Sequence, residues 1–257
     1  MPIFIMEPIV FITGATSGFG AACARRCAAK GYRLILNGRR AERLQKLAAE
    51  LHEAHGTSTF LLPFDVQDRE AVFRAVESLP SEWQDVDVLV NNAGLAAGRD
   101  LFPDARLDDW ETMIDTNLKG VLYVTRAVVP AMIRRSRGMI INIGSIAGKE
   151  VYERGNVYCA TKHAVDALSQ AMRIDLLAHN IRVTAIHPGA AETEFSLVRF
   201  KGDAAAAQKV YEGFTPLQAE DIASIVLFAI EQPPHVCISD LVVMPTQQAN
   251  AYLFHKK

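Results

Sequence analysis

The chain has 257 residues, of which 50% are hydrophobic and 22% are charged, a composition typical of a globular protein rather than a disordered or repetitive one. Lysine and arginine number 27 and aspartate and glutamate 29, so the net charge of −2 leaves no basic excess for binding nucleic acid. No apolar run approaches the roughly 18 residues that a membrane-spanning helix needs, so we also expect no membrane insertion.

Residues 1–8 contain no basic region, no long apolar stretch and no small-residue cleavage site, so the sequence predicts no secretory signal peptide. We interpret residues 1–5 as a short extension before the first strand, and we expect a cytoplasmic protein. The cysteines form no CxxC motif or Cys/His cluster, and the histidines are scattered. We therefore expect no metal site, and small buried thiols rather than a redox or metal role for Cys23, Cys27, Cys159 and Cys237.

Short β-branched segments alternate with longer helical patterns along the chain, and no segment is repeated. Strands are predicted at residues 9–13, 33–37, 59–64, 87–91, 139–143, 182–187 and 241–244. Helices are predicted at residues 19–30, 41–55, 68–78, 108–132, 156–178 and 219–231, and residues 194–212 are a candidate helical lid. Strands separated by such helices imply right-handed crossovers, so we expect an α/β fold: a doubly wound parallel sheet of about seven strands with helices on both faces.

A glycine-rich loop follows the first predicted strand and opens the first predicted helix, with the sequence Thr13-Gly14-Ala15-Thr16-Ser17-Gly18-Phe19-Gly20. Glycines in such a turn let the backbone approach a pyrophosphate closely, and the N–H groups of the helix N-terminus bind its oxygens. The alternative is a structural turn that binds no ligand. We expect a dinucleotide phosphate site formed by Gly14, Thr16, Ser17, Gly18, Phe19 and Gly20.

The end of the second predicted strand indicates which nicotinamide dinucleotide binds. An enzyme that uses NAD usually presents a carboxylate here to the ribose 2′-hydroxyl, whereas this chain has Arg39 and Arg40 and no acidic residue before Glu42. Two guanidinium groups suit the 2′-phosphate of NADP(H). The alternative, that both arginines are solvated residues of a helix N-terminus, is disfavoured because cations oppose the helix dipole there.

Further motifs follow in order along the chain: Asn91-Asn92-Ala93-Gly94, Asn117, Ser145, Tyr158-x-x-x-Lys162 and Pro188-Gly189. Together with the glycine loop they resemble the short-chain dehydrogenase/reductase family over about residues 9–195, and their joint occurrence is far more specific than any one of them. More narrowly, residues 38–40, 142–145, 195–202 and 243–247 resemble the NADP-dependent 3-hydroxy acid (serine and allo-threonine) dehydrogenases. The resemblance implies a Rossmann-like fold and a homotetramer.

The length of the chain fits one large domain or two small ones. No proline- or serine-rich linker and no block of charge interrupts the alternation of strands and helices. We therefore expect a single domain over residues 1–257, with a cofactor half at about 7–150 and a catalytic and substrate half at about 151–257.

Tyr158 and Lys162 are four residues apart on a predicted helix, so their side chains share one face. A free phenol has a pKa near ~10, and a neighbouring ammonium together with a cationic nicotinamide favours the phenolate. We expect Tyr158 to take the substrate's hydroxyl proton during oxidation and to return it during reduction, while Lys162 also binds the nicotinamide ribose. Ser145, at the end of a strand, is expected to polarise the substrate carbonyl. Without the other motifs, such a Tyr/Lys pair would be read as a surface or packing pair.

The resemblance assigns roles to residues on either side of this pair. Asn117 is the fourth catalytic residue of the family pattern, and it would hold a kink and a water that connects Lys162 to solvent. Pro188 and Gly189 would cover the nicotinamide carboxamide, and Thr193 would contact a phosphate. Residues 188–195 are one residue shorter than in similar dehydrogenases and lack a glycine found there, so the lid is expected to differ more than the catalytic residues do.

Two further segments are implied to contact the cofactor. Asp65 and Val66 match the pair that flanks the adenine, although Asp65 could instead cap the next turn. Asn91, Ala93 and Gly94 would lie against the cofactor, since small residues allow close approach. The alternative for this second segment is a turn that stabilises the centre of the sheet.

We expect hydride transfer between NADP(H) and a small-molecule substrate, a 3-hydroxy acid or its aldehyde or ketone. The substrate carboxylate needs a cation, because an unpaired buried charge is prohibitive. Arg199 in the predicted lid is the candidate, with Arg154 and Lys201 behind it, although Arg199 could instead form a salt bridge on the lid surface. Alternative substrates are sulfoacetaldehyde, a 3-oxoacyl thioester or a bulky alcohol. A non-catalytic NADPH sensor is disfavoured because the tyrosine, lysine and serine are all present.

Overall fold

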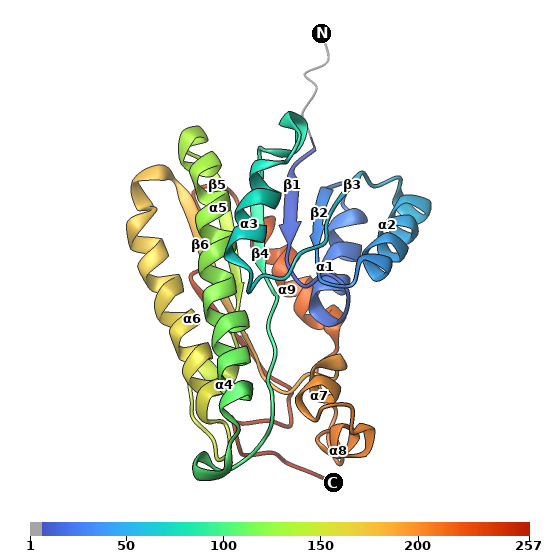
Figure 1. Ribbon diagram of the computed structural model, residues 1–257, viewed down its shortest axis with the longest axis vertical. Coiled ribbons are helices and arrows are strands. Elements are labelled where there is room, and N and C mark those ends of the chain that lie inside the picture. Colours follow the sequence, from blue (N-terminus) through green and yellow to red (C-terminus); the bar gives the residue numbers. More distant parts are fainter. Residues whose placement is uncertain (1–6) are drawn as a thin grey trace.

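The computed structural model describes residues 7–257, so the interpretation of residues 1–5 lies outside the described residues. A seven-stranded sheet, parallel throughout, runs through the molecule in the order β3-β2-β1-β4-β5-β6-β7, and the predicted doubly wound fold is confirmed (Figure 1). The strands are β1 (Ile9–Ile12), β2 (Arg33–Asn37), β3 (Thr59–Leu62), β4 (Val88–Asn91), β5 (Gly138–Ile143), β6 (Ile181–Pro188) and β7 (Asp240–Val243).

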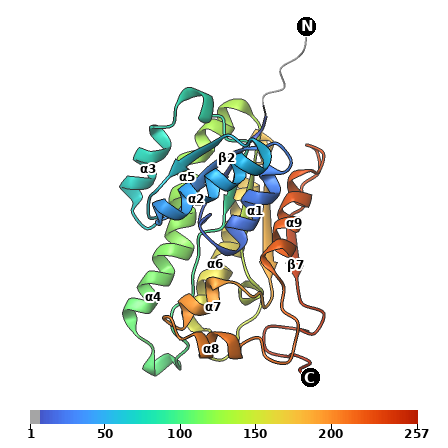
Figure 2. The ribbon, with the colours of Figure 1, turned by 90° about the vertical axis from the view of Figure 1, so that its right-hand side faces the viewer.

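Helices cover both faces of the sheet. One face is covered by α1 (Gly18–Ala28), α2 (Ala41–His55) and α9 (Ala219–Ile230), and the other by α3 (Arg69–Glu77), α5 (Gly120–Arg135) and α6 (Asn156–Asp175). Helix α4 (Leu107–Ile114) packs against α6. Two short helices, α7 (Glu194–Arg199) and α8 (Ala204–Lys209), lie beyond one end of the strands, beside the C-terminal tail (Figure 2).

The strands are apolar in a continuous run because both of their faces are buried. In β1, Val10 and Ile12 pack with α1, α2 and α9, whereas Ile9 and Phe11 pack with α3 and α5. All four side chains are at most 2% exposed. The thiols of Cys23 and Cys27 on α1 are fully buried in the first of these clusters, and Cys159 is also buried, as expected. The expectation is wrong for Cys237, which is exposed.

The candidate lid was predicted as one helical segment over residues 194–212, but the structure has two short helices there. It is broken into α7 and α8 by a turn in which Lys201 and Gly202 have positive φ angles of 53° and 94°. Asp203 then caps α8, since its Oδ1 accepts a hydrogen bond from the backbone N–H of Ala206 at 3.0 Å. The two short helices therefore form an angled cover rather than a single rod.

The strand order reverses between β1 and β4, because β2 and β3 lie on one side of β1 and the later strands on the other. Open α/β sheets bind ligands in the crevice at the carboxyl ends of the strands where this reversal occurs. Along the described part of the chain, no helix combines the length and apolarity needed to span a membrane.

Candidate active site

A cavity of 980 Å³ opens at this crevice, between the loops that follow the central strands and the cover formed by α7 and α8. Most of the predicted site residues line it: Gly14, Thr16, Ser17, Gly18, Phe19, Arg39, Arg40, Asp65, Val66, Ala93, Gly94, Ser145, Tyr158, Lys162, Pro188, Gly189, Thr193 and Arg199. Gly20, Asn91 and Asn117 do not line it, and their side chains or backbone support its walls instead.

The glycine loop is shaped by close backbone contacts. Gly14 and Gly18 have φ angles of 65° and 51°, which side chains disfavour, and a Cβ on Gly14 would lie 2.9 Å from Cα of Ala93. A Cβ on Gly20 would lie 2.4 Å from the carbonyl oxygen of Gly14, so Gly20 serves the packing of α1 against the loop. Because α1 begins at Gly18, the free N–H groups of its first turn lie at this edge of the cavity.

Both predicted arginines follow β2 and lie beside this loop. Arg40 donates from Nη2 to the hydroxyls of Thr16 and Ser17 at 2.9 and 3.2 Å. Arg39 forms an ion pair with Asp65 at 3.5 Å, in which both side chains are at least one-third exposed. An ion pair this exposed contributes little to stability, so the guanidinium remains available to a phosphate.

A third arginine joins the two that the sequence indicated. Arg43, in the first turn of α2, donates to Glu194 at 2.8 Å, and Arg40 reaches the same carboxylate at 3.3 Å. Although burial opposes it, the hydrogen bonds from Arg43 and Arg40 hold the pKa of Glu194 below its ordinary value. Arg43 could have been found from the sequence, because it is three residues after Arg40 on a predicted helix. Its ion pair with Glu194, at the start of α7, could not.

Asp65 and Val66 follow β3 on the adenine side of the expected site. Oδ1 of Asp65 accepts a hydrogen bond from the backbone N–H of Gln67 at 3.0 Å, so the capping alternative describes part of what this side chain does. Val66 is buried, and a Cβ on Gly120 would lie 2.8 Å from its Cγ2. The pair therefore forms a fixed wall between the cavity and α5.

The position of Asn91 differs from its expected place against the cofactor. Its Nδ2 donates to Thr125 at 2.8 Å and to Oδ1 of Asn142 at 2.9 Å, and the side chain is 3% exposed. This side chain stabilises the centre of the sheet, as the structural alternative proposed, because it points away from the cavity. Ala93 and Gly94, in contrast, line the cavity.

Asn117 lies in a π-helical turn (Asp115–Lys119) between α4 and α5, which is where the resemblance placed a kink. Its Oδ1 accepts from the N–H of Leu95 and its Nδ2 donates to the carbonyl of Leu95, both at 2.8 Å. Nδ2 also donates to Thr161 on α6 at 3.2 Å. Asn117 therefore joins the kinked helix to the loop after β4 and to the helix that carries Tyr158.

Tyr158 and Lys162 share one face of α6, and they are 8% and 7% exposed. Burial lowers the pKa of Lys162 to about 8 and raises the pKa of Tyr158 above its ordinary value. Nζ of Lys162 donates to the carbonyl of Ile143 at 2.9 Å. That ammonium lies 6.0 Å from the centre of the tyrosine ring. That Lys162 and a cationic nicotinamide together favour the phenolate stays a prediction. A hydrogen bond from the side chain of Ser145 and the charge of Arg199 oppose the rise for Tyr158.

Ser145 follows β5 in extended backbone with a φ of −173°. Its Oγ accepts a hydrogen bond from the N–H of Ala147 at 3.1 Å, which leaves the hydroxyl proton free to donate. Ser145 and Tyr158 both line the cavity.

Arg199 ends α7 and lies over the ring of Tyr158, with its guanidinium carbon 5.5 Å from the ring centre. Nη2 donates to the hydroxyl of Tyr152 at 3.0 Å, and the buried Nε has no hydrogen-bond partner among residues 7–257. The alternative was that Arg199 forms a salt bridge on the lid surface. It does not hold, because among residues 7–257 the guanidinium contacts the phenol of Tyr152 and no carboxylate. Tyr152 also lines the cavity, and nothing in its spacing singled it out in the sequence.

The two substitute cations for Arg199 are placed elsewhere. Lys201 donates to Asp109 at 2.8 Å and does not line the cavity. Arg154 has a left-handed backbone with a φ of 63° and lies beside a separate, much smaller cavity. Arg199 is therefore the candidate that the structure keeps.

The segment after β6 closes the cavity from the lid side. Gly189 is needed because a Cβ there would lie 2.5 Å from Oε1 of Gln248, which accepts from the N–H of Ala190 at 2.7 Å. Thr193 caps α7 through its Oγ1, which accepts from the N–H of Phe195 at 3.2 Å. The C-terminal tail thus holds the segment from behind, a contribution of Gln248 that the sequence analysis missed.

A parallel sheet with a glycine loop at its reversal point, and a buried Tyr/Lys pair beside a serine, defines a class of nucleotide-dependent oxidoreductases. Residues 8–203 match the family described as short chain dehydrogenase, and the chain belongs to that family.

Relatives of known name are similar over nearly the whole chain. The NADP-dependent 3-hydroxy acid dehydrogenase of Salmonella typhi is 50% identical over 246 residues, which are 95% of this chain and 98% of that protein. Sulfoacetaldehyde reductase 2 of Chromohalobacter salexigens is 49% identical over 245 residues, with 95% and 96% covered. The closed form of a serine dehydrogenase complexed with NADP+ superposes with a TM-score of 0.90 at 47% identity, covering 97% of this chain and 99% of that one.

Proposed function

We propose that the protein is an NADP-dependent oxidoreductase that transfers a hydride between the nicotinamide and a small 3-hydroxy acid or its aldehyde or ketone. The names of the similar dehydrogenases support this proposal. The observation that carries it is the environment of Arg199, a half-buried cation next to Tyr158 whose Nε has no partner among the described residues.

The residues present fit NADP. A side chain at Gly14 or Gly20 would collide with neighbouring backbone atoms. The loop is therefore free of side chains that would block a pyrophosphate from the N-terminus of α1. Arg39 and Arg40 would hold the 2′-phosphate, with Arg43 behind them, since their present partners are exposed carboxylates that a phosphate can replace. No acidic residue stands between Asn37 and Ala41 to take a ribose 2′-hydroxyl as NAD enzymes do.

When bound, the nicotinamide accepts or supplies the hydride. Tyr158 takes the proton of the substrate hydroxyl on oxidation and returns it to the carbonyl oxygen on reduction. The hydroxyl of Ser145 would donate to that same oxygen, and Lys162 would bind the ribose hydroxyls of the cofactor. Because burial raises the pKa of Tyr158 in the chain alone, the positive charge of the oxidised nicotinamide would supply the stabilisation that its phenolate needs. Asn117 acts by fixing the π-helical turn and the loop after β4 around these groups.

Arg199 would bind the substrate carboxylate. A carboxylate that enters a partly dry cavity requires an opposite charge, and a guanidinium presents two parallel donors to it. The hydroxyl of Tyr152 accepts a hydrogen bond from Nη2 and so holds the guanidinium in place beside Tyr158. The distance from Arg199 to the ring of Tyr158 suits a short substrate whose carboxylate and reacting carbon are close together.

A sulfonate would satisfy Arg199 equally well, and one relative is named a sulfoacetaldehyde reductase. Sulfoacetaldehyde reduction is therefore the second candidate function. Both candidates require a small anionic substrate, which disfavours the uncharged bulky alcohols and the long 3-oxoacyl thioesters.

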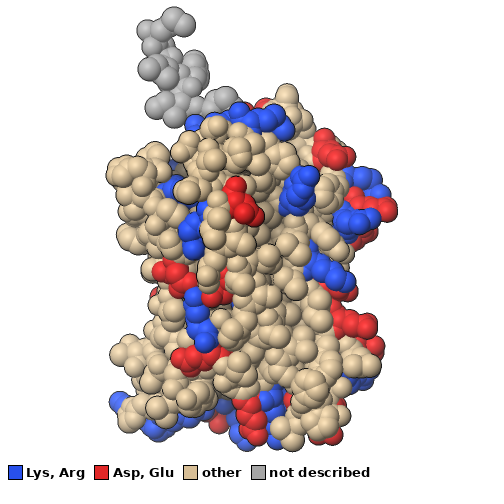
Figure 3. All heavy atoms as spheres, turned by 90° about the vertical axis from the view of Figure 1, so that its left-hand side faces the viewer, with Lys and Arg blue, Asp and Glu red and all other residues tan. Residues whose placement is uncertain are grey.

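We further propose that the whole chain forms a single domain and that the protein is a cytoplasmic homotetramer, the oligomeric state that the family resemblance implies. The oligomer is supported by exposed apolar side chains on α4, α5 and α6, where Leu107, Leu122 and Ile174 are 66%, 38% and 74% exposed. The face that carries these helices has broad areas without charge (Figure 3). The cytoplasm is supported by the cysteines, none of which is paired with another among residues 7–257.

A substrate panel tests the proposed function. Purified protein is supplied with NADP+ and serine, allo-threonine, 3-hydroxyisobutyrate or 3-hydroxypropionate, and with NADPH and sulfoacetaldehyde in the reverse direction, and NADPH absorbance is followed. 1,3-Propanediol is the matched control, because it has the shape of 3-hydroxypropionate without the carboxylate. We expect turnover of at least one anion and poor turnover of the diol. Equal kcat/KM for the diol and the acids would contradict the proposal.

A further inference from the structure

A buried histidine lies directly behind Ser145. His187, the residue before Pro188 in β6, is fully buried, and its Nδ1 lies 3.2 Å from the carbonyl oxygen of Ser145. The ring packs so closely against the same turn that a Cβ on Gly144 would lie 2.5 Å from Nδ1. Since a carbonyl oxygen can only accept a hydrogen bond, this contact requires the ring proton on Nδ1. His187 therefore donates to the backbone of Ser145.

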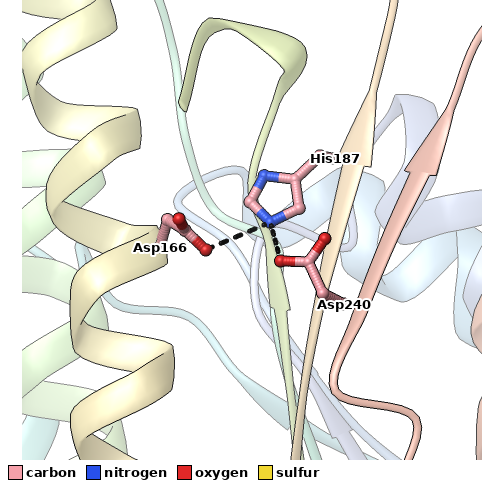
Figure 4. Close-up of side chains that lie close together, drawn as sticks. All are labelled: Asp166, His187 and Asp240. Carbon is pink, nitrogen blue, oxygen red and sulfur yellow. Dashed lines mark ion pairs between the residues drawn. The ribbon is translucent and has the colours of Figure 1, made fainter. Parts of the chain in front are cut away.

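Two carboxylates lie near the other nitrogen of the ring, as Figure 4 shows, and an ammonium lies between them. Nε2 of His187 is 3.3 Å from Oδ2 of Asp240 and 3.6 Å from Oδ1 of Asp166. Nζ of Lys149 lies 2.6 and 2.9 Å from the same two oxygens. Lys149 thus supplies the cation that these carboxylates need, so we do not assign Asp166, His187 and Asp240 to a metal ion.

This group of four residues, the His187 cluster, joins the turn of Ser145 to the catalytic helix. Lys149 stands at the end of the short turn that Ser145 begins. Asp166 follows Tyr158 and Lys162 on one stripe of α6, because the three are spaced at i, i+4 and i+8. The contacts of the cluster therefore set the place of Ser145 relative to Tyr158 from behind, outside the cavity.

The orientation of the His187 ring gives Nδ1 a hydrogen-bond partner and leaves Nε2 without one. Nε2 is buried and has no hydrogen-bond partner among residues 7–257, and such an atom costs free energy. Burial lowers the pKa of His187, although the charge of Asp240 opposes this, so the neutral ring with one proton is favoured. Packing alone gives no reason for a histidine here, whereas the donor at Nδ1 does.

We propose that His187 is a positioning residue for Ser145. Its Nδ1–H fixes the carbonyl of Ser145, which also accepts from the N–H of Gly148 at 2.8 Å, and thereby the direction in which the serine hydroxyl faces the substrate. The close packing of the ring against Gly144 holds it in the orientation that this requires. The inference rests on the role of Ser145 in the proposed function.

His187→Asn and His187→Leu form a matched pair for the test, because the two side chains have the same shape and only the amide of Asn can donate near the position of Nδ1. We expect His187→Asn to keep kcat within about 3-fold and His187→Leu to lower it by about 10-fold, the factor of one hydrogen bond. The KM for the substrate and the Kd for NADPH should stay near the wild-type values in both. Equal losses in the two variants, or wild-type kcat in His187→Leu, would overturn the inference. If His187→Leu does not fold, His187→Gln replaces it, since its amide reaches Nε2 rather than Nδ1.

Ser145→Ala separates this inference from the proposed function. If His187 acts through Ser145, His187→Leu should lower kcat no further in a Ser145→Ala background. A further 10-fold loss in the double variant would mean that the two residues act independently, and the inference alone would fail. Wild-type kcat in Ser145→Ala would refute the role of Ser145 and the inference together.

Discussion

The guanidinium of Arg199 lies 5.5 Å from the ring centre of Tyr158, so the cation and the proton carrier face the same end of the cavity. A substrate whose anion binds Arg199 is therefore presented to Tyr158 within the length of a few bonds. This relationship limits the proposed substrates to short acids.

Arg199→Met should raise the KM for 3-hydroxypropionate or serine by about 10- to 100-fold, because a charged hydrogen bond of roughly 1.5–3 kcal/mol is lost. The Kd for NADPH and the turnover of 1,3-propanediol should not change. Arg154→Met is the matched control, since Arg154 does not line the main cavity. Steady-state kinetics of both variants measure this, and an Arg199→Met enzyme with wild-type KM for the acids would show that another group binds the carboxylate.

The cofactor preference should depend on Arg39 and Arg40. The wild-type protein should bind NADP far more tightly than NAD, and each alanine substitution should weaken NADP binding by about 10- to 150-fold, the worth of one charge-assisted contact. NAD binding should hardly change, because its ribose carries no phosphate there. Fluorescence titration of the wild type and the two variants gives the six constants, and equal wild-type affinity for the two dinucleotides would refute the assignment.

Glu194→Gln should tighten NADP binding by about 2- to 5-fold, because the carboxylate competes with the 2′-phosphate for Arg40 and Arg43 and an exposed ion pair is worth roughly 0.2–1 kcal/mol. Glu42→Gln, on α2 next to Arg43 but outside the cavity, is the control. The difference should shrink at high salt. Weaker NADP binding in Glu194→Gln would mean that Glu194 supports the arginines rather than competing with the ligand.

Lys162→Met should abolish turnover and yet stabilise the fold at neutral pH, on the order of 1–3 kcal/mol. Burial lowers the pKa of Lys162 from 10.5 to about 8, so the unfolded chain binds more protons than the folded chain between these values. Stability contributed by this group therefore rises with pH in that window, and its cost is fully present below pH 8. The gain in Tm of Lys162→Met over wild type should be largest at pH 7 and shrink towards pH 9.5. Thermal melts across this range measure the gain, with exposed Lys46→Met as control, and a gain that does not vary with pH would contradict the burial argument.

The fold was predictable because its strands are buried on both faces, which leaves uninterrupted apolar runs such as Ile9–Ile12. The break between α7 and α8 had a local signal that the prediction did not use, because Gly202 favours the end of one helix and Asp203 favours the start of the next. The asparagine of β4 was misplaced since its motif serves both the sheet and the cofactor, and only the neighbours Thr125 and Asn142 decide where Asn91 points.

The remaining misses are contacts between distant parts of the chain. Glu194 lies 151 residues beyond Arg43, and Gln248 lies 58 residues beyond Ala190, so neither pairing has a local signal. The hydrogen bond of Lys162 is a contact of the same kind. Spacing along one helix places Lys162 beside Tyr158, but the carbonyl of Ile143 that binds the ammonium comes from β5.

The most direct test of the account is the kinetics of Tyr158→Phe, which keeps the ring and removes only the hydroxyl. With the best acid from the substrate panel, kcat should fall by at least ~10²-fold while the Kd for NADPH stays within about 2-fold of wild type. Tyr32→Phe, remote from the cavity, should behave as wild type. A Tyr158→Phe enzyme that keeps most of its turnover would show that Tyr158 does not carry the proton and would contradict the mechanism.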